Sequence, residues 1–159
     1  WSSLVGSEMC IRDSPISVFA QEQLTLDNIL TISDKNSFLK EVIENGYSEG
    51  NSTKDKIYYG KGFKKEKTQA TDWAEYTLAS GEFYFEQSNL DFVRKSGDCY
   101  YDVIVSDVKS KCTFIEIKEH TGKTKTVNFA TYDCPKKSYN GDIGFAQVDG
   151  NGVVLLFSK

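Results

Sequence analysis

The sequence predicts an α+β domain in which an antiparallel sheet dominates and helices pack on one face of it. Ten Phe, nine Tyr and two Trp among 159 residues favour pleated strands, on which aromatic side chains pack well. Only two prolines interrupt the chain, so long strands are possible. Apolar residues recur at helical spacing near the start and again near the middle, and alternate elsewhere between glycine-containing turns.

The first 20 residues are set apart from this domain. Residues 1–14, WSSLVGSEMCIRDS, fit neither helical nor strand periodicity. The string SLVGSEMCIRDS resembles the conceptual translation of a sequencing-adapter scar; a frayed natural terminus is the alternative. Residues 15–20, PISVFA, resemble the end of a secretory signal peptide, with Ala20 before the cleavage point; the alternative is a short buried strand. This leaves residues 21–159 as one α+β domain that we expect to be secreted or periplasmic.

Two helices are expected first. In the segment 24–32, Thr25 can cap a short helix. In the segment 33–47, Ser33 or Asp34 can cap a longer one, and Asn45-Gly46 ends it because glycine adopts the left-handed conformation easily. Residues 49–55 have the composition of a loop.

Strands follow. The segment 56–63 predicts a strand, and the segment 73–87 predicts a hairpin. A three-residue loop, Ala79-Ser80-Gly81, would pair Tyr76 with Tyr84 and Thr77 with Phe83.

The segment 100–112, YYDVIVSDVKSKC, is compatible with a strand or a helix. Its composition suits a strand, whereas apolar residues at positions 101, 104, 105 and 108 match one face of a helix. We favour the helix, with Asp98 as its cap. Hairpins are then expected over 112–134, with a turn near Gly122, and over 141–159, where the turn sequence 149–152 leaves the tip undecided.

Three cysteines follow residue 20: Cys99, Cys112 and Cys134. A hairpin turn around Lys123 places Cys112 opposite Cys134, and also pairs Phe114 with Tyr132, Ile115 with Thr131 and Ile117 with Phe129. In an oxidising compartment this register predicts a Cys112–Cys134 disulfide, with Cys99 free and buried. The alternative is three free thiols.

A helix followed by an antiparallel run of strands thus occurs twice, compatible with two similar halves. This element order is similar to β-lactamase-inhibitor-like and outer-membrane-assembly lipoprotein domains. IENGY near the start and Cys…Tyr-x-Cys near the end resemble uncharacterised exported proteins of Bacteroidota. Neither resemblance implies an activity.

The residue content excludes most chemistries. The formal net charge is −4, and the densest basic run, residues 61–67, contains Glu66, so no nucleic-acid partner is expected. His120 is the single histidine and is expected at an exposed turn. The cysteines lack metal-ligand spacing, and no motif for a nucleophile or a phosphate is present. No catalytic residue, metal or cofactor is therefore predicted, and no segment after residue 20 is long and apolar enough to span a membrane.

The lack of catalytic motifs, together with the many aromatic residues on predicted strands, favours a function in binding another molecule. We expect an exported, non-catalytic binding or envelope-associated domain for an unidentified protein or envelope ligand. Its contact surface would consist of four strand aromatics: Trp73, Tyr58, Tyr76 and Tyr84. The alternative is a small hydrolase of envelope carbohydrate that uses two of the carboxylates Glu75, Glu82 and Glu86.

Overall fold

The computed structural model describes residues 23–63, 70–122 and 124–158. The expected scar (1–14) and signal-peptide remnant (15–20) lie outside these residues. Within them, two helices followed by four strands occur twice along the chain. The elements are α2 (Leu26–Leu30), α3 (Lys35–Glu44), β1 (Ser48–Glu49), β2 (Lys56–Lys61), β3 (Asp72–Thr77), β4 (Phe83–Gln87), α4 (Leu90–Ser96), α5 (Tyr100–Lys111), β5 (Thr113–Thr121), β6 (Thr126–Asp133), β7 (Gly141–Val148) and β8 (Asn151–Ser158).

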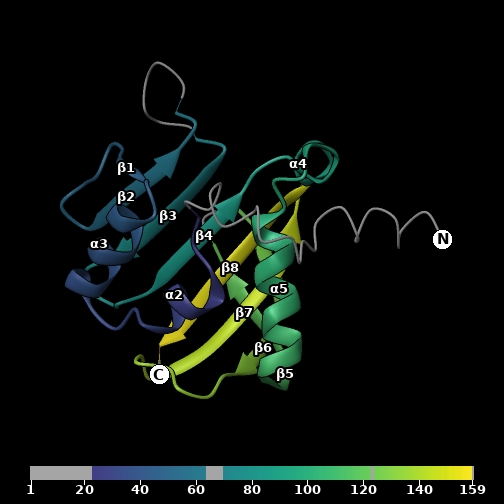
Figure 1. The fold of residues 1–159 in the computed structure, drawn as a ribbon. Coiled ribbons are helices and arrows are strands. Elements are labelled where there is room, and N and C mark those ends of the chain that lie inside the picture. The colour runs from purple at the N-terminus through teal and green to yellow at the C-terminus, as the bar shows by residue number, and fades with distance from the viewer. Residues whose placement is uncertain (1–22, 64–69, 123, 159) are drawn as a thin grey trace.

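The eight strands that the structure describes form one open antiparallel sheet (Figure 1). Their order is β1-β2-β3-β4-β8-β7-β6-β5, so each half contributes a four-stranded meander and the two meanders join through their last strands. Helix α3 contacts β3, and α5 contacts β4 and β8. An antiparallel sheet accompanied by helices is thus confirmed, and the sheet is the larger part of the fold.

The first two helices begin and end at the expected residues. Thr25 caps α2, and its side chain accepts a hydrogen bond from the backbone of Asn28. Asp34 caps α3 by accepting from the backbone of Ser37, and Gly46 follows the helix with a φ of 80°. These caps are local, which is why the sequence revealed them.

The ambiguous segment is the helix α5, as favoured, but Asp98 does not cap it. Its N-cap is Cys99, which makes no side-chain capping bond. Helix α4 and the two-residue strand β1 were not predicted. The N-cap of helix α4 is Asn89, which has a left-handed backbone and makes no side-chain capping bond, so no sequence signal marks the start of the helix.

The hairpin β3–β4 has a different register from the predicted one. Tyr76 lies opposite Phe83, and Glu75 lies opposite Tyr84. The loop has four residues, 78–81, because the backbone N–H of Thr77 donates to the carbonyl of Glu82. Since a shift of one residue reverses the face of a side chain, Tyr84 lies on the face opposite Tyr76.

The hairpin β5–β6 confirms the Cys112–Cys134 disulfide. Next to it, Phe114 lies opposite Tyr132 as predicted, but a bulge at Ile115 shifts the remaining pairs, so Ile117 lies opposite Ala130 rather than Phe129. Cys99 is buried as expected. Its sulfur is nevertheless in a disulfide, so the prediction of a free thiol is wrong.

The structure shows which residues form the turn of hairpin β7–β8. Val148 lies opposite Asn151, which leaves Asp149 and Gly150 as a two-residue loop. Both have positive φ, 51° and 80°, as a tight turn between twisted strands requires.

The buried residues form two clusters. The larger one contains residues of all four described helices together with alternate strand residues such as Tyr76, Phe83 and Ile143. The smaller one consists of Phe129, Val153, Leu155 and Phe157, with no helical residue. Tyr84 packs against the smaller cluster, so we call the face of the sheet that carries it the Tyr84 face.

Candidate functional site

One row of directly opposed residues defines the Tyr84 face across the sheet, because opposed residues of an antiparallel pair lie on the same face. From β2 to β5, the row consists of Tyr58, Glu75, Tyr84, Leu155, Gly144, Thr131 and Glu116. The row runs from polar and aromatic residues on β2–β4, through small and apolar residues, to a carboxylate on the edge strand β5.

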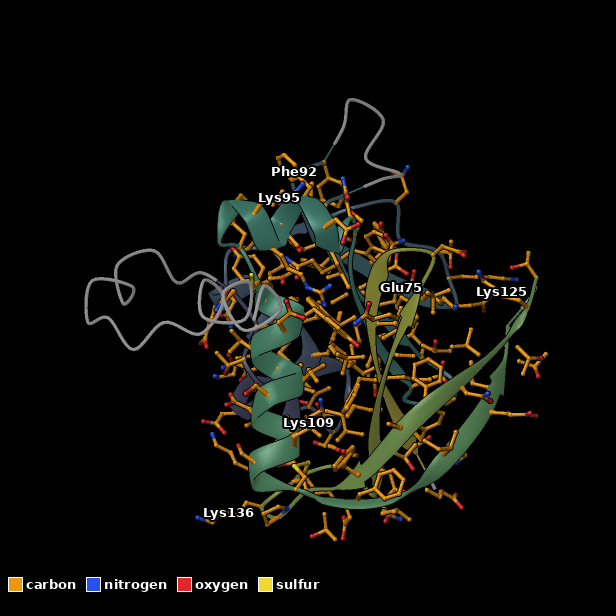
Figure 2. The ribbon with its side chains drawn as sticks, turned by 90° about the vertical axis from the view of Figure 1, so that its right-hand side faces the viewer. Glu75, Phe92, Lys95, Lys109, Lys125 and Lys136 are labelled. Carbon is orange, nitrogen blue, oxygen red and sulfur yellow. A yellow bond between two sulfur atoms is a disulfide. The ribbon has the colours of Figure 1, made fainter. Side chains whose placement is uncertain are left out.

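A cavity of about 380 Å³ is hollowed into this face. Its lining comes from β2–β4, the β5–β6 hairpin and the β7–β8 hairpin: Lys56, Glu75, Thr77, Glu82, Tyr84, Glu86, His120, Gly122, Thr124, Lys125, Val127, Phe129, Val148, Asp149, Asn151 and Val153. Strands β3 and β5 are far apart in the sheet order, so a shared cavity requires a curved sheet. Figure 2 shows the β5–β6 hairpin sweeping from the base of α5 out to Lys125.

Two glutamates of β3 and β4 form the polar part of the cavity. Glu86 is only 8% exposed, and the hydroxyl of Tyr84 donates to its Oε1 at 2.6 Å. Burial raises the pKa of the Glu86 carboxyl; the Tyr84 hydroxyl opposes this effect, and the charge of Glu75 adds to it. Burial also raises the pKa of the Glu75 carboxyl. The ammonium of Lys56, whose Nζ lies 3.7 Å from Oε2 of Glu75, opposes this effect.

The cavity has more negative than positive side chains. Four carboxylates line it, against the two ammonium groups of Lys56 and Lys125. Lys56 pairs with Glu75, and Lys125 pairs with Asp149. Among the described residues, Glu82 and Glu86 therefore have no cationic partner. A buried carboxylate without one favours the binding of a positive charge.

Aromatic rings continue the face beside the cavity. The rings of Tyr58 and Trp73 lie 6.5 Å apart, and those of Tyr58 and Phe63 lie 6.1 Å apart. Burial, followed by the charges of Glu75 and Glu86, raises the pKa of Tyr58 to about 12, so its hydroxyl stays a neutral donor at physiological pH.

The structure brings three of the four predicted contact residues together. Trp73, Tyr58 and Tyr84 lie on the Tyr84 face. Tyr76 does not: it is 5% exposed and its ring stacks on Phe38 at 5.4 Å, inside the larger core cluster. The predicted contact surface is therefore corrected by the removal of Tyr76.

His120 does not lie at an exposed turn. It is a half-buried residue of β5, opposite Val127, and its ring packs edge-on against Phe129 and Phe157. Together with Lys56, Lys125 and Asp149, it belongs to a site that sequence reasoning did not assemble. No local signal could have done so, because these residues meet only through the curvature of the sheet.

A second cavity, of about 780 Å³, lies where β3 begins and β4 ends. Its lining includes Asp72, Trp73, Gln87, Phe92 and Tyr100. Asp72 is 6% exposed, and its Oδ1 has no hydrogen-bond partner among the described residues. Burial raises the pKa of Asp72 to about 6, although Lys61 opposes this shift.

Comparisons with known protein families, with curated proteins and with solved structures found no match. In the described part of the chain, no helix is long and apolar enough to cross a membrane. Within the same residues, no three His, Cys, Asp or Glu side chains are grouped closely enough to hold a metal ion. The function must therefore be argued from the geometry of the Tyr84 face.

Proposed function

We propose that the protein is an exported binding domain whose helices pack on one face of the sheet, while the Tyr84 face binds a partner protein through a positively charged side chain. The observation that carries this proposal is the buried carboxylate of Glu86, which lines the cavity and has no cationic partner among the residues that the structure describes. A lysine or arginine of the partner would enter the cavity and neutralise it.

The surroundings of the cavity suit a macromolecular partner. Tyr58 and Trp73 lie beside the glutamates on the same face, and rigid aromatic side chains provide contact area at a low cost in conformational entropy. The ring faces can also attract a cation. The smaller core cluster lies on this same face, and its members Phe129 and Val153 give the cavity an apolar part of its lining.

Export is the second part of the proposal. It is supported by the resemblance of residues 15–20 to the end of a signal peptide, and by the Cys112–Cys134 disulfide, because disulfides persist in oxidising compartments outside the cytoplasm. Fractionation of cells that express the natural gene, followed by immunodetection, should find the protein outside the cytoplasm. Recovery in the cytoplasmic fraction alone would contradict this part.

Glu86→Gln should weaken binding of a basic peptide at least tenfold, about 1.4 kcal/mol, because it removes the buried charge and keeps the side-chain shape. The measurement is calorimetric titration with nonapeptides that differ only in a central Arg, Lys, Gln or Glu. We expect wild type to prefer Arg and Lys, and high salt to reduce this preference only partly, since the carboxylate is buried.

The matched control is Glu44→Gln, an exposed glutamate on α3 that pairs with Lys40. It changes the net charge by the same amount at a distance from the cavity, and should leave peptide binding unchanged. Equal weakening by both variants would show that only net charge matters, and it would contradict a site at Glu86.

The hydrolase alternative has one observation in its favour. Glu75 and Glu86 lie diagonally across β3 and β4 on one face, a spacing of about 7–8 Å between Cα atoms, and both line the cavity. Glycosidases use two carboxylates in a cleft. Release of reducing ends from peptidoglycan or another envelope polysaccharide, abolished by either Glu75→Gln or Glu86→Gln, would establish hydrolysis and replace the binding proposal.

A further inference from the structure

The two edges of the sheet differ in length and composition. Strand β1 forms one edge and has two residues, whereas β5 forms the other and has nine. Along β5 three large apolar side chains are exposed: Phe114 by 51%, Ile115 by 44% and Ile117 by 60%. A long edge strand with exposed apolar residues presents unpaired backbone groups that can pair with another strand.

We propose that β5 pairs antiparallel with β5 of a second copy of the chain, centred on Ile117, so that two sheets become one across a two-fold axis. In this register Ile117 faces Ile117 of the second copy. Glu116 faces Lys118 of the second copy, and Lys118 faces Glu116 of the second copy. The symmetry therefore creates two oppositely charged pairs and one apolar pair from three consecutive residues.

Neighbouring registers lack this complementarity. A two-fold axis perpendicular to the sheet keeps corresponding faces on the same side. Such an axis passes midway between the two copies of one residue of β5, which therefore lie opposite each other. Centring on Glu116 places two glutamates opposite each other, and centring on Lys118 does the same with two lysines. Because like charges directly opposite each other are destabilising, the sequence of β5 selects Ile117 as the centre.

The contacts that β5 already makes are compatible with this pairing. The backbone carbonyl of Glu116 accepts a hydrogen bond from Thr131 Oγ1 at 2.7 Å. Glu116 is an exposed residue, so its carboxylate can meet a second copy. The ammonium of Lys118 lies 4.8 Å from the centre of the Phe157 ring. This side chain is exposed, and its flexible stem allows it to reach a carboxylate across the interface. The bulge lies at Ile115, so the central pairs fall where the pairing with β6 is regular.

The pairing has a consequence for binding. Glu116 lies on the Tyr84 face, so the two copies would present their Tyr84 faces on the same side of one continuous sheet. The dimer does not depend on the proposed ligand, because neither Glu116 nor Lys118 lines the cavity.

The test is sedimentation velocity of the full chain over a range of concentrations, with single and paired charge reversals. We expect wild type to dimerise. Glu116→Lys should weaken dimerisation at least tenfold because it creates two lysine pairs, and Lys118→Glu should do so because it creates two glutamate pairs. The two variants mixed together should form a heterodimer, and the double variant Glu116→Lys with Lys118→Glu should dimerise like wild type.

The matched control is Lys95→Glu on α4, an exposed lysine (Figure 2) whose reversal changes the net charge as Lys118→Glu does. It should dimerise like wild type, and circular dichroism should show the same fold for every variant. A wild type that stays monomeric at millimolar concentration would overturn the proposal. So would single variants that dimerise as tightly as wild type, or a mixture that does not associate.

Discussion

Replacing both Cys112 and Cys134 by alanine should lower the free energy of unfolding by about 3 kcal/mol. The disulfide joins residues that are 22 apart in sequence, and closing a loop of this length restricts the unfolded chain by about that amount. It ties the end of α5 to the end of β6, so its loss removes a constraint between a helix and the second strand from the edge of the sheet.

Urea denaturation of the double variant under non-reducing conditions measures this effect. Reductant is not a substitute, because Cys99 is also in a disulfide. The control is Thr113→Ala, an exposed residue adjacent to Cys112, which should change stability by no more than about 0.5 kcal/mol. A loss below about 1 kcal/mol for the double variant would show that the bridge does not stabilise the fold as expected.

Asp72→Asn should raise the free energy of unfolding at pH 7 by up to about 3 kcal/mol. The pKa of Asp72 is about 6 in the folded chain and 3.8 in a solvated chain, and each pKa unit corresponds to about 1.4 kcal/mol. Ionised Asp72 is therefore unfavourable in the folded state. Asparagine has nearly the same shape and carries no charge.

The direction of the pH dependence follows from the same values. Below pH 4 the carboxyl is protonated in both states, and its burial carries no ionic penalty. As the pH rises from about 4 to 6, the unfolded chain ionises first, so wild-type stability falls; above about pH 6 the penalty is constant.

Thermal or urea denaturation from pH 4 to pH 7 tests this prediction. The gain from Asp72→Asn should be small at pH 4 and largest at pH 7. Asp55→Asn, at an exposed loop position, is the control and should show no such trend. A gain that is equal at every pH would contradict an ionisation effect, and a loss of stability at pH 7 would show that the carboxylate is needed in the fold.

Sequence reasoning succeeded where structure depends on neighbouring residues. The caps of α2 and α3 and the end of α3 at Gly46 each involve contacts within a few positions. The Cys112–Cys134 pair was also predicted correctly, although the register of most of that hairpin was not. The bulge at Ile115 offsets a difference of one residue at the turn, so the two cysteines still lie opposite each other.

The register of the β3–β4 hairpin could not be predicted from neighbouring residues alone. A three-residue and a four-residue loop both suit the sequence at 78–81, yet they place Tyr84 on opposite faces of the sheet. The observed loop is the one that puts Phe83 and Phe85 into the core. Because burial of the whole strand decides between the two loops, the turn sequence alone could not.

Helix α4 and the cavity depend on contacts between distant segments. The backbone N–H of Leu90 donates to the carbonyl of Gly150, and that of Asn89 donates to the side chain of Asn151, so the start of α4 is held by the β7–β8 turn. The amino-acid sequence by itself determined helices α2 and α3 with their caps and the hairpin that carries the Cys112–Cys134 disulfide, because the energies involved are local. Only the tertiary structure decided which side chains share the Tyr84 face, because pairing β4 with β8 and curving the sheet toward β5 are set by burial of the whole core.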